Sequence, residues 1–235
     1  MGKQEVRERV WRALEIHGAA RFPGANGRIP NFTGAEHAAD RLARLPAWKQ
    51  ARVIKVNPDA PQIPVRRRAL REGKIVYMAV PRLVDERCFI ELDPARLGAD
   101  AARAGTIKGA AALGRPLRVD EVRPLDLIVC GSVAVNQHGE RVGKGGGYSD
   151  LELGLLRQAG AVGLRTPVVT TVHPLQVVEE RIDMLPHDLP LDWIVTPEVA
   201  MRCAHIHAKP RGVYWEFLAE EKIAAIPALA RLRAR

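Results

Sequence analysis

The sequence predicts a three-layer α/β fold, with a mostly parallel, open Rossmann-like central sheet and helices on both of its faces. Short apolar runs alternate along the chain with segments of helical periodicity. Parallel strands are buried on both faces, so near-continuous apolar runs are typical of them. The 235 residues are enough for one large core, and we expect a single domain over residues 1–235.

Three apolar residues predict the first helix. Val6, Val10 and Leu14 are four residues apart and form one stripe along a helix. The same spacing puts Lys3 and Arg7 on a shared face, where two cations can reach one phosphate group. A solvated basic face is the more common meaning of such spacing, so both interpretations stay open on the spacing alone.

Strands and helices then alternate. Glycine and proline recur through residues 18–33, which predicts a long loop of the kind that is often functional in compact domains. Strands are expected where β-branched residues cluster between turn signals, and a short basic helix is expected between the first two strands. The predicted helices are 3–17, 35–45, 65–71, 149–158 and 214–232, and the predicted strands are 51–56, 74–80, 126–135, 168–172 and 193–196.

The chain is basic, with a formal net charge of +9. A positive surface concentrates polyanions such as ATP or nucleic acid, although a general bias toward arginine explains the charge equally well. Only 5% of the residues are aromatic, and the four tryptophans are scattered. A surface that stacks single-stranded bases is therefore poorly supported.

The cysteine content and the hydropathy indicate a cytoplasmic protein. Cys88, Cys130 and Cys203 are far apart and odd in number, so they form no disulfide framework and fit a reducing compartment. The N-terminus is charged from Lys3 onward, without the apolar core of a signal peptide. No apolar run approaches the roughly 18 residues of a membrane span, so we expect no membrane association.

The most informative segment is residues 139–150, which read GERVGKGGGYSD. Consecutive glycines let backbone N–H groups converge on an anion, and Arg141 and Lys144 supply positive charge. The segment follows an apolar run that reads as a strand and precedes a helical pattern whose positive dipole end faces it. Strand, glycine loop and helix in this order predict a phosphate site.

Two familiar phosphate motifs do not match this loop. A Walker loop needs Ser or Thr after its Gly-Lys pair, and Gly145 stands there. A dinucleotide fingerprint that begins at Gly143 needs a glycine where Tyr148 stands. A glycine-rich hairpin without a ligand remains the alternative.

Several histidines and a cysteine are weaker candidates. Cys203, His205 and His207 alternate as metal ligands on a strand would, but structural zinc usually needs a second pair of ligands, so we expect no metal there. His173 ends an apolar run and is interpreted as a buried, hydrogen-bonded side chain. His187 precedes Asp188 and could orient that carboxylate.

The loop resembles the signature of the 5-formyltetrahydrofolate cyclo-ligase family, which is similar to Arg-hydrophobic-Gly-x-Gly-x-Gly-Tyr-Tyr-Asp. The matching residues are Arg141, Gly143, Gly145, Gly147, Tyr148 and Asp150, with Ser149 in place of the second tyrosine. Lys3 and Arg7 resemble the start of the family pattern, and the run from Leu185 to Thr196 resembles its late Pro-x-His-Asp segment and the following strand. Together these similarities span residues 3 to 196.

This resemblance implies an enzyme that uses ATP and Mg²⁺ to convert 5-formyltetrahydrofolate to 5,10-methenyltetrahydrofolate. Asp150 and Asp188 are the implied Mg²⁺ ligands, and Lys144 and Arg141 are the implied catalytic residues because phosphoryl transfer depends on charge neutralisation. The implied ATP-binding residues are Lys3, Arg7, Arg141, Gly143, Lys144, Gly145, Gly146, Gly147 and Tyr148. Gln62 and Tyr148 are the implied contacts to a folate-like substrate.

Two departures from the family pattern concern the substrate. Gln62 stands where the family carries a glutamate near the reacting formyl group, and a neutral amide cannot act as a base. The other departure is Ser149. A segment that reads Asn-Pro-Asp-x-Pro-Gln and a loop that ends Gly-Tyr-x-Asp-Leu-Glu resemble a divergent branch that includes the methenyltetrahydrofolate synthase domain-containing proteins. Two alternatives therefore stay open: an ATP-binding relative that acts on another heterocycle, such as a thiamin-related one, and a non-catalytic RNA-associated module.

Overall fold

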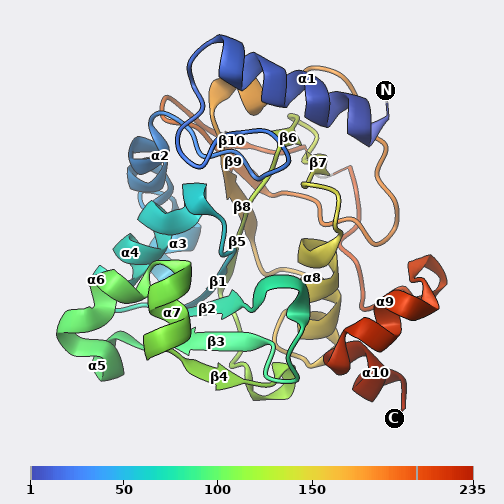
Figure 1. The fold of residues 1–235 in the computed structure, drawn as a ribbon. Coiled ribbons are helices and arrows are strands. Elements are labelled where there is room, and N and C mark those ends of the chain that lie inside the picture. Colours follow the sequence, from blue (N-terminus) through green and yellow to red (C-terminus); the bar gives the residue numbers. More distant parts are fainter. Residues whose placement is uncertain (1, 205, 235) are drawn as a thin grey trace.

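A computed structural model describes residues 2–204 and 206–234 of the chain (Figure 1). The helices are α1 (Lys3–Ile16), α2 (Ala35–Leu42), α3 (Pro46–Gln50), α4 (Ile63–Arg71), α5 (Pro94–Leu97), α6 (Ala101–Ala104), α7 (Ile107–Leu113), α8 (Tyr148–Gln158), α9 (Glu220–Ala225) and α10 (Pro227–Arg233). The strands are β1 (Val53–Val56), β2 (Ile75–Ala79), β3 (Phe89–Leu92), β4 (Arg115–Leu117), β5 (Leu127–Cys130), β6 (Ala134–Val135), β7 (Arg141–Val142), β8 (Val168–Thr171), β9 (Trp193–Val195) and β10 (Ala200–Arg202).

Eight strands form one sheet in the order β10-β9-β8-β5-β1-β2-β3-β4. The five central strands, from β9 to β2, are parallel to their neighbours, whereas β10, β3 and β4 pair antiparallel at the two edges. The predicted mostly parallel sheet is confirmed. The carboxyl ends of the parallel strands face one edge, where ligands collect in open α/β sheets.

Helices cover both faces of this sheet (Figure 1). On one face, apolar residues of α2, α4, α6 and α7 pack with those of the central strands around the buried Trp48. On the other face, α8 packs together with α9 and α10. The N-terminal helix α1 packs on the small hairpin of β6 and β7 through its predicted stripe of Val6, Val10 and Leu14. The three-layer prediction is therefore confirmed.

The strand that the sequence predicts over 126–135 is interrupted. Strand β5 ends at Cys130, and the chain leaves the sheet to form β6, which pairs with β7. Gly131 is the first residue after the break. A Cβ there would lie 2.8 Å from Ile29 and 3.0 Å from the side-chain oxygen of Gln62, so only glycine fits without a shift of these neighbours. The apolar letters continue through the break because β6 is also buried, so the sequence alone reads as one strand.

The predicted helix over 214–232 is also wrong as a single element. A one-turn 3₁₀ helix at Trp215–Phe217 is followed by α9 and α10, which meet at Ile226. Ile226 is extended, with φ −115° and ψ 101°, because the ring of Pro227 disfavours helical geometry at the preceding residue. The edge strands β3, β4 and β10 and the helices from α5 to α7 were not predicted either.

In the described part of the chain, no helix has the length and apolar character needed to cross a membrane.

Candidate functional site

The glycine loop connects β7 to α8 at the carboxyl end of the parallel sheet (Figure 1). The hairpin that carries it pairs Ala134 with Val142 and Val135 with Arg141. Gly147 is the N-cap of α8 with φ +66°, and Gly145 has φ +109°. Both values lie in the region that favours glycine, so the loop geometry accounts for two of the glycines in the motif.

The backbone of the loop leaves its N–H groups open, whereas two of its carbonyls accept hydrogen bonds from side chains. Among the residues that the structure describes, no protein oxygen accepts a hydrogen bond from the N–H groups of residues 143–147. In contrast, the Gly143 carbonyl accepts from Arg7 Nε at 2.7 Å, and the Gly146 carbonyl accepts from Lys222 Nζ at 2.8 Å. Open amides next to a helix N-terminus are suited to an anion.

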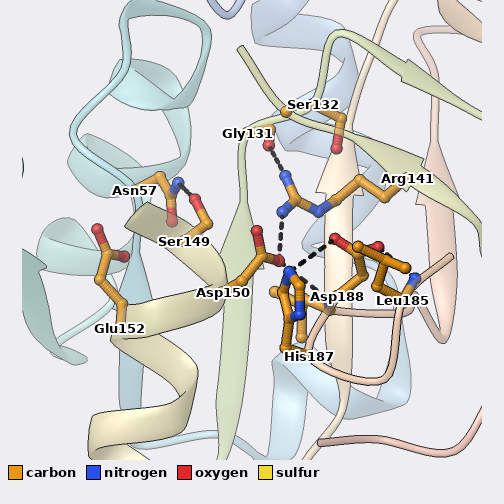
Figure 2. Close-up of polar contacts among 12 residues, drawn as sticks. Asn57, Gly131, Ser132, Arg141, Ser149, Asp150, Glu152, Leu185, His187 and Asp188 are labelled. Carbon is orange, nitrogen blue, oxygen red and sulfur yellow. Dashed lines mark hydrogen bonds and ion pairs between the residues drawn. The ribbon is translucent and has the colours of Figure 1, made fainter. Parts of the chain in front are cut away.

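Arg141 is buried behind the loop and joins it to the sheet. Its Nη1 donates to the Gly131 carbonyl at 3.0 Å, and its Nη2 donates to Asp150 Oδ1 at 2.9 Å (Figure 2). Burial lowers the pKa of the guanidinium, but the nearby carboxylates of Asp150 and Asp188 raise it above its ordinary value overall. Arg141 therefore stays charged inside the protein.

The two implied metal ligands both lie near Arg141, and Figure 2 draws them in one cluster. Asp150 Oδ1 also accepts from the Leu189 N–H at 2.9 Å, and Asp188 forms an ion pair with Lys3 and accepts from the Leu185 N–H at 2.6 Å. Asp188 precedes β9, so topology alone puts it at the far end of the sheet. Instead, the long connection from β8 to β9 folds back toward the glycine loop.

The N-terminal helix completes this cluster. Arg7 lies close enough to Arg141 and Asp188 for both to affect its pKa, which burial and Arg141 lower and Asp188 raises. The structure thus brings together five predicted site residues that come from three distant parts of the chain: Lys3, Arg7, Arg141, Asp150 and Asp188. This proximity supports the interpretation of the Lys3 and Arg7 spacing as part of a site.

Each carboxylate of the pair keeps one oxygen that is available to a hard cation. Each carboxylate uses one oxygen for the hydrogen bonds above; within the described residues, no donor lies within hydrogen-bond distance of Asp150 Oδ2 or Asp188 Oδ1. Mg²⁺ is often held by one or two carboxylates together with substrate phosphates. No group of three or more His, Cys, Asp or Glu ligands occurs in residues 2–204 and 206–234, so a site built from protein ligands alone is not found there.

A pocket next to the loop is lined by Asp59 together with loop residues that include Lys144 and Tyr148. The half-exposed side chain of Lys144 places Nζ 3.4 Å from Asp59 Oδ1, and its ammonium group has no other ion-pair partner among the described residues. Tyr148 is half-buried, and Lys222 Nζ lies 5.1 Å from its ring centroid. Lys144 is consequently free to turn toward a ligand, whereas the Tyr148 ring is held at the pocket wall.

Gln62 is completely buried at the base of the same region. Its amide nitrogen donates to Thr171 Oγ1 at 3.3 Å, and its Oε1 has no hydrogen-bond partner. A Cβ on Gly131 would lie 3.0 Å from this oxygen and 3.2 Å from Asp59 Oδ2. Two acceptors therefore lie close to Gly131, and the unpaired Gln62 Oε1 is a buried acceptor without a donor.

The sequence analysis missed three polar residues near the loop, which are Lys55, Asn57 and Glu152. Lys55 forms a buried ion pair with Glu152 and also donates to Asn57, whose amide donates to Ser149 Oγ at 2.8 Å. Asp59 was missed as well. Asn57 and Asp59 follow directly after β1, and the rule that polar residues at carboxyl ends of parallel strands gather in one site could have found them.

The histidines and the cysteine make different contacts. His173 is partly buried, caps a short 3₁₀ turn and has its pKa lowered by burial, in agreement with its interpretation. His187 Nε2 lies 4.0 Å from Asp188 Oδ1. Of the alternating trio, Cys203 is buried with its pKa raised to about 12 by burial, His207 Nε2 lies 2.9 Å from Glu140 Oε1, and His205 lies outside the described residues.

Glu140 fixes the turn that precedes the loop. It is fully buried and is hydrogen-bonded to Arg181, His207, Asn136 and the Ile182 N–H. Burial by itself raises the pKa of its carboxyl group, but the hydrogen bonds outweigh burial and lower the pKa to about 2. A group whose pKa is depressed in the folded state contributes stability above its unfolded pKa and loses it as the pH falls toward the folded value.

We expect Glu140→Gln to destabilise the protein by about 3 kcal/mol at pH 7, the equivalent of a pKa shift of roughly two units. The difference from the wild type should disappear as the pH is lowered from about 4.5 to 2, the interval between the unfolded and folded pKa values. Urea unfolding at several pH values measures this. Glu36→Gln, at an exposed position, is the control, and a deficit that does not change with pH would contradict the assignment.

The fold and the cluster define an α/β protein with a candidate anion site on a glycine loop at the carboxyl edge of its sheet. Residues 1–197 match the model of the 5-formyltetrahydrofolate cyclo-ligase family. The chain belongs to this family. Membership supports the prediction of an enzyme of the ligase class.

Curated relatives extend the similarity beyond residue 197. The chain is 40% identical over 238 residues to the methenyltetrahydrofolate synthase domain-containing protein of Mus musculus, covering 100% of this chain and 64% of that protein. The Homo sapiens protein of the same name is 36% identical over 238 residues, with 100% and 62% covered. The chain thus spans less than two thirds of these relatives' length.

A solved structure agrees on the fold. The NMR structure of Aquifex aeolicus 5,10-methenyltetrahydrofolate synthetase aligns with a TM-score of 0.55 and 22% sequence identity, covering 88% of this chain and 96% of that one. The predicted resemblance to the cyclo-ligase family and its divergent branch is confirmed.

Proposed function

We propose that this protein is a ligase that uses ATP and Mg²⁺ to convert 5-formyltetrahydrofolate to 5,10-methenyltetrahydrofolate, with release of ADP and phosphate. The observation that carries the proposal is the convergence of open loop amides, the cations Arg7, Arg141 and Lys144, and the carboxylates of Asp150 and Asp188. Cations and amides bind a polyphosphate, and a paired carboxylate site suits the Mg²⁺ that accompanies it.

In this reaction the formyl oxygen attacks the γ-phosphorus, and the bond to ADP breaks. The neighbouring folate nitrogen, a secondary amine, then attacks the formyl carbon of the imidate phosphate, which closes the five-membered ring, and this amine loses its proton. Phosphate leaves through C–O cleavage to give the methenyl group, so the formyl oxygen leaves on the phosphate. Both steps need positioning and charge stabilisation more than a covalent contribution from the protein.

Each residue has a role that follows from its position. Arg141 is buried and rigid, so it holds the loop and adds a fixed positive charge. Lys144 is mobile enough to follow the charge of the transferred phosphoryl group. Asp150 and Asp188 would hold Mg²⁺, which when bound neutralises phosphate charge. Lys3, Arg7 and the amides of Gly143, Gly145, Gly146 and Gly147 complete the nucleotide site.

Asp59 and Tyr148 line the substrate side of the pocket, and Gln62 is buried behind it near Asp59. Gln62 cannot accept a proton, but Asp59 puts a carboxylate beside it, over Gly131. Two acceptors fit a ring with N–H donors, and Tyr148 provides an aromatic surface next to the loop. Because Gln62 and Ser149 both depart from the family pattern, another heterocycle, such as a thiamin-related one, is the second candidate substrate.

One assay tests this function. The protein is incubated with 5-formyltetrahydrofolate and Mg-ATP, and methenyl absorbance is followed over time. Growth of the signal with stoichiometric phosphate release supports the proposed reaction. Binding of Mg-ATP without turnover would overturn the folate assignment and favour the second candidate, and absence of both would overturn the nucleotide site as well.

Lys144→Ala tests the nucleotide site at the residue with the fewest structural contacts. Loss of one charge-assisted contact should weaken Mg-ATP binding about ten- to a hundredfold. Stability should not change, because Lys144 is half-exposed. Isothermal titration calorimetry measures the affinity, and Lys108→Ala, at another exposed lysine, is the control. Equal affinity in Lys144→Ala and the wild type would exclude Lys144 from the site.

A further inference from the structure

The segment after the family-model match forms one wall of the glycine-loop site. The match ends at residue 197, yet α9 and α10 lie beside α8 (Figure 1). Ile223, Ile226 and Leu229 are buried in the same core as the apolar face of α8. This segment is therefore part of the folded domain.

Lys222 extends from α9 to the loop. Its Nζ donates to the Gly146 carbonyl at 2.8 Å and lies 5.1 Å from the ring centroid of Tyr148. A Cβ on Gly147 would be 3.4 Å from the same nitrogen. Burial lowers the pKa of Lys222, and the nearby carboxylate of Asp150 raises it. The ammonium thus contacts the loop at the point where α8 begins.

The segment around Lys222 is fixed at several points. The Phe217 ring lies 4.7 Å from that of His187, next to Asp188, and the Val213 N–H donates to Gln158 at the end of α8 at 3.2 Å. Gly212 also approaches α8 closely, since a Cβ on Gly154 would be 2.9 Å from its carbonyl oxygen. A lysine on a segment anchored in this way can hold the loop in one position.

The contact between Lys222 and the Gly146 carbonyl affects which way the loop carbonyls point. A carbonyl oxygen that faces a phosphate repels it, so an anion-binding loop must turn its carbonyls away while its N–H groups stay free. Arg7 holds the Gly143 carbonyl from the N-terminal helix, and Lys222 holds the Gly146 carbonyl from the C-terminal segment. Side chains from the N-terminal helix and from the C-terminal segment therefore both hydrogen-bond to the loop.

We propose that Lys222 is a positioning residue that keeps the glycine loop in its anion-binding conformation, so that residues beyond 197 are a working part of the site. Lys222 acts through the Gly146 carbonyl and the Tyr148 ring. Its effect on the loop stands on the contacts above, and its effect on nucleotide affinity rests on the proposed function.

Trypsin measures the loop conformation directly, because half-exposed Lys144 lies within it. The initial rate of cleavage after Lys144, measured by mass spectrometry as the appearance of peptides that begin at Gly145, should rise about tenfold in Lys222→Met, which keeps most of the aliphatic stem but removes the hydrogen bond and the charge. Lys222→Arg should restore a rate near that of the wild type. Lys108→Met, at an exposed lysine on α7, should leave the rate unchanged. Urea-unfolding midpoints of all variants should agree.

Calorimetry with Mg-ATP separates this proposal from the proposed function. Weaker binding by Lys222→Met, about tenfold, together with faster cleavage supports both. Faster cleavage with no Mg-ATP binding to the wild type supports the positioning role and removes the nucleotide function. Cleavage of Lys222→Met at the wild-type rate overturns the positioning role, whatever the affinity.

Discussion

Lys55→Met is expected to lower the free energy of unfolding by about 3–5 kcal/mol, the usual result of removing one partner of a buried ion pair. Lys55 and Glu152 join β1 to α8, and their side chains are only 2% and 7% exposed. Without the ammonium, the carboxylate of Glu152 is left without a counter-ion in a place where burial already raises its pKa. Asn57 also loses the donor that orients its amide toward Ser149. Urea or guanidinium unfolding gives the measurement.

The double variant Lys55→Met with Glu152→Leu decides whether the loss comes from the unpaired charge. Removing both ions from a buried pair is often close to neutral, so the double variant should regain most of the lost stability. Arg233→Met is the control, because its pair with Glu220 is 51% and 74% exposed and should contribute less than about 1 kcal/mol. A double variant as unstable as the single one would mean that Lys55 matters for packing instead of charge.

The parallel centre of the fold was predictable because its signal is local. Each central strand is a short, mostly apolar run, and helix α8 is bounded by the glycine loop before it and a segment with Gly160 and Gly163 after it. The edge strands carry a weaker signal: β4 is three residues long and contains Pro116, and only its pairing with β3 defines it as a strand. Such pairing is a long-range contact that no local pattern encodes.

Local sequence patterns predicted only part of the candidate site. Residues on the glycine loop were predicted because a glycine cluster with cations is typical of an anion site. The spacing of Lys3 and Arg7 left two interpretations open, and the family resemblance was needed to assign them and Asp188 to the site. Lys55 looked like an ordinary strand residue, since nothing near it in sequence reveals that Glu152 lies opposite. Lys222 looked like a solvated helix residue, because its role depends on how α9 packs against α8.

Arg141→Met is expected to have two separable effects, on stability and on nucleotide binding. The substitution leaves the Asp150 carboxylate and the Gly131 carbonyl without their donor in a nearly closed site, at a cost of about 3–5 kcal/mol in unfolding free energy. It also removes a fixed positive charge behind the loop, so Mg-ATP affinity should fall by more than about a hundredfold. Arg141→Lys keeps the charge but cannot reach both oxygens with a planar fork, and it should lie between these limits.

The double variant Arg141→Met with Asp150→Asn separates the two effects. A neutral amide at position 150 removes the unpaired charge, so unfolding experiments should show most of the stability restored. Calorimetry should still show weak Mg-ATP binding, because neither the guanidinium nor the Asp150 carboxylate is present. If the double variant bound Mg-ATP as tightly as the wild type, Arg141 would be only a structural support. If binding stays weak in a stable protein, the loss of affinity does not come from unfolding, and comparison with the single variant Asp150→Asn shows how much of it is due to the charge of Arg141.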